Sequence, residues 1–304
     1  MTSSAVALPR VAWWPAWITE RVPILTVVAI LFVFWYLAAF LMNEPQVRDA
    51  FERNEVKYTL SDVIAGTMSA DRPVVPAPHQ VAVELYDSIF GYPLDSRRNL
   101  AYHAWVTLSA TAVGFAIGAI FGIVLAILIV HLRTLEKSLL PWIICSQMVP
   151  ILAIAPIVIV VFGAIGIRGT LPKSIISAYL CFFPVTIGMV KGLTSPDPIQ
   201  LDLMRTWSAN KLQVFWKLRW PSSIPFLFTS LKVSVTISLV GAIVAELPTG
   251  AQAGIGARLL TGSYYGQTVQ IWAALVAAAV IATVLIGIIE LIAKWTARRM
   301  GATA

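Results

Sequence analysis

The chain alternates long runs of apolar residues with shorter polar connections. Six of these runs are almost free of charge: 23–42, 100–130, 139–162, 174–191, 222–247 and 269–293. An α-helix rises 1.5 Å per residue, so about 20 residues cross the roughly 30 Å hydrocarbon layer of a membrane. The pattern therefore predicts an all-α membrane protein with six transmembrane helices.

The distribution of basic residues predicts the orientation of these helices. Twelve Lys or Arg residues lie in segments on one side: Arg10, Arg21, Arg133, Lys137, Lys191, Arg205, Lys211, Lys217, Arg219, Lys294, Arg298 and Arg299. The short loops on the other side hold only Arg168, Lys173 and Arg258. Because cytoplasmic loops carry the excess of positive charge, both termini should be cytoplasmic, with 1–22 as the N-terminal segment and 296–304 as the tail. The first run is too long for a cleaved signal peptide and lacks a small-residue cleavage site.

Composition supports a membrane protein. Hydrophobic residues make up 58% of the 304 residues, charged residues only 12%, and mean hydropathy is +0.81. A soluble domain carries about 25% charged residues. The net charge of +7 could suggest a nucleic-acid partner, but the basic residues lie at the ends of apolar runs, which argues against nucleic acid.

The region 43–99 is the one long polar segment. Its net negative charge predicts that it lies on the outer side of the membrane, opposite the positive cytoplasmic loops. Its acidic residues outnumber its basic ones. Within it, Val81, Leu85 and Ile89 recur every four residues, which predicts a short helix on the outer membrane surface, ended by Gly91 and Pro93. We group 23–99 as the first span with this outer segment, and the role of 43–72 stays open.

Two membrane runs carry unusual residues. Gly114, Gly118 and Gly122 form one smooth stripe, which favours close approach of a neighbouring helix, with a flexing gate as the alternative. The run 139–162 contains Pro141, Pro150 and Pro156. Prolines at this density predict a broken helix beside protein or a wetted cavity.

That broken run supplies most of the candidate substrate pathway. The pathway candidates are Ser146, Gln147, Met148, Pro150 and Lys232. A helix–helix hydrogen bond is the alternative role for Gln147. Lys232 follows Pro221 by about 16 Å of helix, so its charge needs a partner or water. Pairing across a dimer is the favoured role for Lys232, and contact with an anionic substrate is the alternative.

The polar stretch 202–221 interrupts the apolar C-terminal half. Leu201, Met204 and Trp207 recur at three-residue spacing, and Leu212, Phe215 and Trp216 at three and four, so two short helices can each present an apolar face. Ser208, Ala209 and Asn210 lie between them, where the chain can turn. An amphipathic loop resting on lipid headgroups is the simpler alternative.

The spacing of this stretch resembles a known family. Permeases of ATP-binding-cassette (ABC) importers carry a cytoplasmic loop with E-A-A, three residues, G, nine residues and I-x-L-P. Asp202-Leu203-Met204, Ser208 and Leu218-Arg219-Trp220-Pro221 stand in that register, with serine in place of the glycine and tryptophan in place of the leucine. The likeness runs from about Pro76 to Trp295.

Further motifs resemble the nitrate/taurine/sulfonate-type branch. They are R-T at 205–206, Q-V-F-W-K-L-R at 213–219, G-A-I-V-A-E at 241–246, and G-I-G at 254–256 for the family's G-L-G. The run S-Q-x-x-P-x-x-A-x-A-P at 146–156 is similar to permeases for pyrimidine, thiamine-precursor or riboflavin systems.

The resemblance implies a type I ABC importer permease with a core at 100–295 and a coupling loop at 195–221. The implied coupling residues are Asp202, Met204, Arg205, Ser208, Leu212, Phe215, Trp216, Leu218 and Pro221. The apolar face of Leu212, Phe215 and Trp216 should pack on an ATPase subunit. If the glycine position needs a positive φ, Ser208 is mildly unfavourable there.

The implied partners complete an importer in the bacterial inner membrane. They are two cytoplasmic ATPase subunits, a second permease (an identical or a related chain), a periplasmic or lipid-anchored binding protein, and the lipid bilayer. The chain has no G-x-x-x-x-G-K-[ST], so ATP would be bound by the partners, and we expect no catalytic residue and no cofactor of its own. His79, His103 and His131 lack metal-ligand spacing, and Cys145 and Cys181 are expected as buried free thiols.

The expected function is import of a small solute, either a sulfonate- or nitrate-like anion or a pyrimidine or vitamin precursor. An ion-gradient-driven secondary transporter is the alternative, and it would need acidic or histidine relays within the membrane. The last two runs offer only Lys232, Glu246 and Glu290. A membrane enzyme would need a cluster of His, Asp or Cys on facing runs, which the sequence lacks.

Overall fold

The computed structural model describes residues 16–248 and 253–300, and within them it is all-helical. Residues 1–83 and 84–304 form two compact units, which are described separately. Five helices are long and apolar enough to cross a membrane, and a bent helix pair supplies a sixth crossing if the pair counts as one span. The all-α membrane fold is confirmed.

The first unit contains a helix much longer than the predicted span. Helix α1 covers Ala16–Arg53, so the polar residues after Met42 continue the helix instead of forming a loop. Helix α2 (Leu60–Met68) packs back against α1. At its start, hydrogen bonds from Thr59 hold the pKa of Asp62 below its ordinary value.

The buried side chain of Asn43 ties the following segment to α1. Its amide nitrogen donates to the carbonyl oxygen of Val75 at 2.8 Å, and its oxygen accepts from the backbone N–H of Val74 at 2.7 Å. The Trp35 indole N–H donates to the carbonyl oxygen of Pro76 at 2.9 Å. The outer segment of unknown role is thus an ordered extension of the first span.

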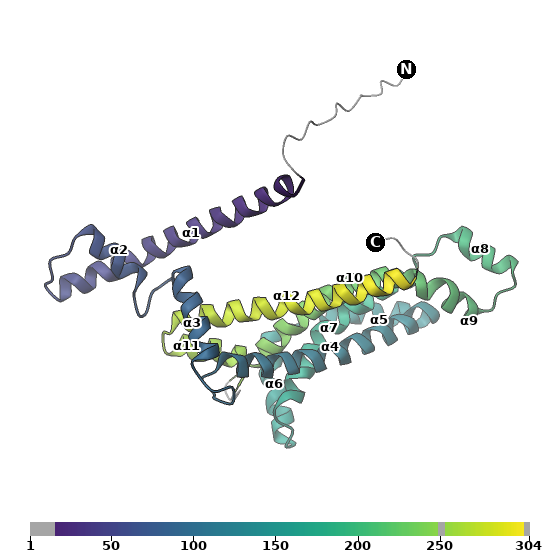
Figure 1. Cartoon of the computed structure of the whole chain (residues 1–304). Coiled ribbons are helices and arrows are strands. Elements are labelled where there is room, and N and C mark those ends of the chain that lie inside the picture. The colour runs from purple at the N-terminus through teal and green to yellow at the C-terminus, as the bar shows by residue number, and fades with distance from the viewer. Residues whose placement is uncertain (1–15, 249–252, 301–304) are drawn as a thin grey trace. The chain divides into compact units, whose positions relative to one another are not determined.

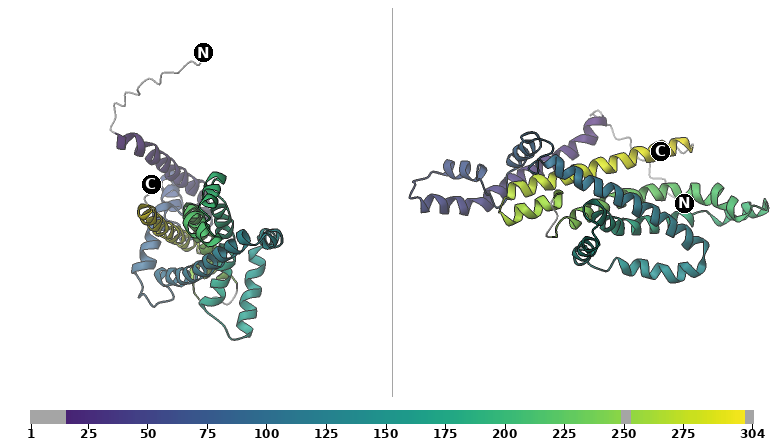
Figure 2. Two further views of the ribbon diagram at one scale, coloured as in Figure 1. Left: turned by 90° about the vertical axis from the view of Figure 1, so that its right-hand side faces the viewer. Right: turned by 90° about the horizontal axis from the view of Figure 1, so that it is seen from below.

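The second unit is built around three helices that lie side by side (Figures 1 and 2). They are α4 (Leu100–His131), α7 (Thr170–Leu193) and α10 (Trp220–Ala245). Helix α12 (Thr268–Arg299) packs along α10, and α11 (Ile255–Tyr264) precedes it. Helix α3 (Pro78–Phe90) ends directly before Gly91, as predicted, and Leu85 and Ile89 pack near Leu100.

The third predicted span is not one straight helix. Helix α5 (Arg133–Ser146) and helix α6 (Ile151–Ala164) meet at 94°. Pro150 lies at the N-cap of α6, where its missing N–H costs no helical hydrogen bond. The polar turn expected at 131–137 is also shorter than predicted, because only Leu132 separates α4 from α5.

Small residues let α7 approach α4 closely. A Cβ atom on Gly118 would lie 2.7 Å from the carbonyl oxygen of Ala178, and one on Gly122 would lie 2.7 Å from that of Phe182. Such distances leave no room for any side chain. The glycine stripe therefore serves the predicted close approach, and its partner is α7.

Helix α7 packs on α10 in the same way. A Cβ atom on Gly188 would lie 2.5 Å from the Ser230 side chain. The hydroxyl groups of Ser177 and Ser238 are 2.6 Å apart, and the Ser238 hydroxyl donates to the carbonyl oxygen of Thr111 on α4 at 3.2 Å. Because lipid supplies no hydrophobic force between helices, close packing and hydrogen bonds must hold these three together.

A leucine at Gly118 tests this packing. The Gly118→Leu variant should lower stability by at least about 1–3 kcal/mol, because the side chain must enter the α4–α7 contact. The measurement is the thermal unfolding midpoint of the purified chain in detergent. Gly287→Leu is the matched control, since nothing lies within 4 Å of a Cβ atom at Gly287. Equal midpoints for the two variants would contradict the packing account.

Candidate functional site

The segment 195–221 forms two short helices joined by a turn, as the spacing predicts. Helix α8 covers Pro198–Thr206 and helix α9 covers Lys211–Val214. Each begins with a reciprocal cap: Asp197 accepts from the N–H of Ile199 at 2.9 Å, and Asn210 accepts from that of Gln213 at 2.8 Å. These caps satisfy donors that a helix start leaves free.

The turn between the helices places Ser208 in the left-handed region, with φ of 53°. The N–H of Ser208 donates to the carbonyl oxygen of Arg205 at 2.9 Å, and that of Ala209 to the oxygen of Met204 at 3.0 Å. This pair of bonds is a Schellman motif, which usually has glycine at its left-handed position. The family's glycine thus has a backbone role that Ser208 fills at a steric cost.

Phe215 does not lie where the sequence places it. Its side chain is buried against residues of α4, α7 and α10 and contacts the ring of His131, with centroids 5.2 Å apart. It begins a short π-helix, η1 (Phe215–Arg219), that leads directly into α10. The ring therefore anchors the segment to the helix bundle and is not part of the exposed apolar face of the segment.

Other apolar side chains of the segment remain exposed. Trp207 is 72% exposed, Leu212 is 67% exposed and Trp216 is 56% exposed. Asp202 and Arg205 form an exposed ion pair at 2.9 Å, while Met204 and Leu218 are half-buried and Pro221 is exposed. An exposed apolar surface at a loop is typical of a site that binds another protein.

The bend between α5 and α6 holds the predicted pathway residues. The Gln147 amide donates to the Ser146 hydroxyl at 3.3 Å, and the Tyr179 hydroxyl donates to the carbonyl oxygen of Ser146. Met148 is 74% exposed. Cys145 is also exposed, which corrects the expectation of a buried thiol, whereas Cys181 is buried as expected.

Lys232 has a partner within its own chain. Its ammonium lies 3.6 Å from the Glu290 carboxylate on α12, and Lys294 lies 2.9 Å from the same carboxylate. Lys232 thus has an ion-pair partner within its own chain, and the two roles expected from the sequence, pairing across a dimer or contact with an anionic substrate, stay predictions.

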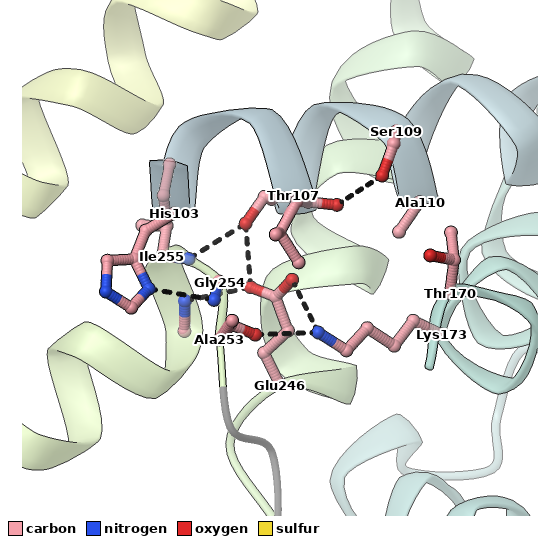
Figure 3. A network of polar contacts seen from close by, with 12 residues as sticks. His103, Thr107, Ser109, Ala110, Thr170, Lys173, Glu246, Ala253, Gly254 and Ile255 are labelled. Carbon is pink, nitrogen blue, oxygen red and sulfur yellow. Dashed lines mark hydrogen bonds and ion pairs between the residues drawn. The ribbon is translucent and has the colours of Figure 1, made fainter. Parts of the chain in front are cut away.

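A buried polar network at the far end of the core was missed by the sequence analysis (Figure 3). The Glu246 carboxylate is fully buried and lies 3.2 Å from the ammonium of Lys173 on α7. It also accepts hydrogen bonds from the Thr107 hydroxyl at 2.8 Å and the Gly256 N–H at 3.0 Å. Every charge in this cluster is paired.

The same network holds the start of α11. Three successive backbone N–H groups, those of Gly254, Ile255 and Gly256, donate to His103 Nδ1 at 3.0 Å, Thr107 Oγ1 at 2.8 Å and Glu246 Oε2 at 3.0 Å. Because His103 Nδ1 accepts the N–H of Gly254, it carries no proton, so the imidazole is neutral and its single N–H, at Nε2, donates to the carbonyl oxygen of Arg97 at 2.9 Å.

Two motifs quoted for the family resemblance meet in this network. Glu246 ends G-A-I-V-A-E, and Gly254 and Gly256 are the glycines of G-I-G. A side chain on either glycine would overlap Glu246. The sequence signal was therefore present, but nothing in it shows that the two motifs touch. Within 16–248 and 253–300, no group of His, Cys, Asp or Glu side chains could hold a metal ion.

Comparison with known proteins identifies the family. The family model described as "Binding-protein-dependent transport system inner membrane component" matches residues 118–302, more than half of the chain. The chain belongs to this family. The permease is accordingly a multi-pass inner-membrane protein, as the sequence predicts.

Named relatives of the permease come from several transport systems. A formylaminopyrimidine transport permease protein of Halalkalibacterium halodurans is 30% identical over 64% of this chain and 72% of its own. A riboflavin transport system permease protein of Chloroflexus aurantiacus is 29% identical over 74% and 81%. A nitrate import permease protein of a Synechocystis strain is 24% identical over 72% and 76%.

The buried ion pair can be tested by a mutant cycle. Lys173→Met should lower stability by about 3–5 kcal/mol, because it leaves the Glu246 carboxylate buried without a cation. Lys173→Met combined with Glu246→Gln should recover much of that loss. Thermal unfolding in detergent measures both, and Arg205→Ala, which breaks an exposed pair, should cost less than about 1 kcal/mol. Equal losses for Lys173→Met and Arg205→Ala would refute the buried network.

Proposed function

We propose that the permease is the membrane subunit of an ATP-driven importer of a small solute. The family match supplies the class, and the observation that carries the mechanism is the geometry of 195–221. This segment presents exposed Leu212 and Trp216 to a partner, while Phe215 fastens it to the core. A rigid attachment of this kind lets movement of a partner subunit move the helices.

The proposed partner at this segment is a cytoplasmic ATPase subunit, with two ATPases per importer. Closure of the ATPases would push on α8 and α9, and Phe215 would pass that movement to α4 through the His131 ring. Hydrolysis belongs to the partners, so the permease is a non-catalytic subunit.

A second permease and a binding protein complete the proposed assembly. We propose a homodimer of permeases, with a related second chain as the alternative. The alternative rests on Ser208, which holds a left-handed backbone conformation that glycine adopts without strain. A segment with this unfavourable residue is easier to keep when a second, related permease carries a better copy of the segment. Intact-complex mass measurement distinguishes one permease species in two copies from two species.

The proposed solute is a small anion or a pyrimidine or vitamin precursor. The named relatives transport a formylaminopyrimidine, riboflavin and nitrate, so the scaffold serves both classes. An ion-gradient mechanism gains no support from the two acidic residues near the ends of the last two spans. Glu246 is paired with Lys173, and Glu290 with Lys232 and Lys294.

We place the pathway at the bend between α5 and α6. Ser146, Gln147, Met148 and Pro150 lie where the helix direction changes by 94°. The bend exposes backbone polar groups, which in a membrane must face protein or water. Lys232 lies on α10 beside Glu290 of α12 and not at this bend, so we leave it out of the proposed pathway.

The coupling proposal predicts a specific loss of function. Leu212→Glu in the reconstituted importer should reduce solute-stimulated ATP hydrolysis by at least about tenfold, because a desolvated carboxylate at an apolar contact costs more than about 1.4 kcal/mol. Leu132→Glu is the matched control, since Leu132 is half-exposed on the same predicted side but outside the segment. Both variants should insert and fold. Normal stimulation in Leu212→Glu would remove the segment from the mechanism.

The pathway proposal predicts a transport defect without a hydrolysis defect. Gln147→Leu should lower solute uptake several-fold while basal ATP hydrolysis continues, because the substitution removes an amide that a passing polar solute can contact. Gln147→Asn keeps the amide and should retain more uptake. Unchanged uptake by Gln147→Leu would exclude this residue from the pathway.

A further inference from the structure

A cluster of three charged side chains joins α10 to α12, which we call the Lys232–Glu290–Lys294 cluster. One carboxylate, that of Glu290, contacts two ammonium groups, at 3.6 Å and 2.9 Å. The side chains are between 37% and 56% exposed, so the cluster is open to its surroundings. It carries a net charge of +1.

No other carboxylate of the C-terminal part is free to balance this charge. After Glu136, the chain has only Asp197, Asp202, Glu246 and Glu290 as acidic residues. Asp197 caps α8, Asp202 pairs with Arg205, and Glu246 pairs with Lys173. The second ammonium of the cluster therefore has no carboxylate of its own in this part of the chain.

The cluster lies at one boundary of the hydrocarbon layer. The stretch Val269–Ile289 contains no charged residue and, as a helix, spans roughly 31 Å, about the thickness of that layer. Glu290 is the next residue, and Lys294 follows one turn later. Trp295 is 57% exposed and carries the Arg299 guanidinium over its ring at 3.9 Å, an arrangement typical of a membrane interface.

An open groove between α10 and α12 leads to the cluster. Its walls include the apolar side chains of Ile224, Phe228, Ala293 and Ala297, and its polar end is formed by Lys232, Glu290 and Lys294. The groove therefore combines an apolar surface with a net positive end at headgroup depth. A molecule with a hydrocarbon chain and an anionic head matches both features.

We propose that this groove binds an anionic phospholipid, with its phosphate at Lys232 and Lys294 and an acyl chain along the apolar wall. The phosphate supplies the missing negative charge, and Glu290 keeps the two ammonium groups in place without neutralising both. The proposal does not depend on which solute the permease transports.

Native mass spectrometry of the delipidated importer complex tests the proposal. The complex is incubated with equal concentrations of phosphatidylglycerol and phosphatidylcholine, and the lipids retained per permease are counted. The wild type should retain phosphatidylglycerol in preference. Each Lys→Gln change, Lys232→Gln or Lys294→Gln, should weaken that binding about fivefold, and the double variant should lose the preference.

Two control variants distinguish lipid binding at the cluster from general attraction by basic residues and from a purely structural role of the ion pair. Lys137→Gln removes an exposed lysine on the same predicted side and should leave binding unchanged. Glu290→Gln removes the competing carboxylate and should bind phosphatidylglycerol at least as tightly as the wild type. Size-exclusion profiles verify that each variant is folded.

Four results would overturn the proposal. They are equal retention of both lipids by the wild type, unchanged preference in the double lysine variant, loss of preference in Glu290→Gln, and displacement of the lipid by glycerol 3-phosphate at similar concentration. The last result would assign the cations to a soluble anion. A fifth result would also overturn it: an intact complex that binds no lipid while the isolated chain does would assign the groove to a protein partner.

Discussion

The contact of α7 with both α4 and α10 is the constraint on which the rest of the permease depends. At glycines on each of the three helices, an added Cβ atom would lie too close to the neighbouring helix for any larger residue to fit. In a bilayer no hydrophobic force drives helices together, so this steric fit and the hydroxyl hydrogen bonds replace it. A core whose helices fit together this closely has few alternative packing arrangements, so it can move as one rigid body.

Both ends of this core carry attachments that suit such movement. At one end, the Lys173–Glu246 pair joins α7 to α10, and His103 and Thr107 of α4 hold the start of α11. At the other end, Phe215 enters the core beside His131 and fixes the 195–221 segment to α4. The contacts between these ends run through the packed helices, and we propose that they pass a displacement of the segment on to the core.

The sequence predicted the features that depend on local pattern. Hydrophobic runs located the spans, apolar periodicity on either side of a turn located α8 and α9, and the family spacing indicated that Ser208 could require a positive φ, which the backbone shows. The helix ending at Gly91 was predicted for the same reason, since glycine and proline act on their immediate neighbours.

Features that depend on distant contacts were not predicted. Phe215 fits an apolar helical face in the sequence, and only the packing of α4, α7 and α10 shows that its ring points inward while Leu212 and Trp216 stay exposed. Lys232 and Glu290 lie far apart in the chain, so their pairing needed the fold. Glu246 and the G-I-G glycines were visible as separate motifs, and their meeting across a loop was not. The 94° bend at Pro150 was foreseen as a break, but not as a change of direction.

Solute uptake by proteoliposomes tests the central claim most directly. The complete importer, with its ATPases and binding protein, is reconstituted and supplied with ATP on the side of the ATPases. The account predicts uptake that requires both ATP and the binding protein and that persists when ionophores abolish all ion gradients. Uptake driven by an imposed proton or sodium gradient in the absence of ATP would contradict it.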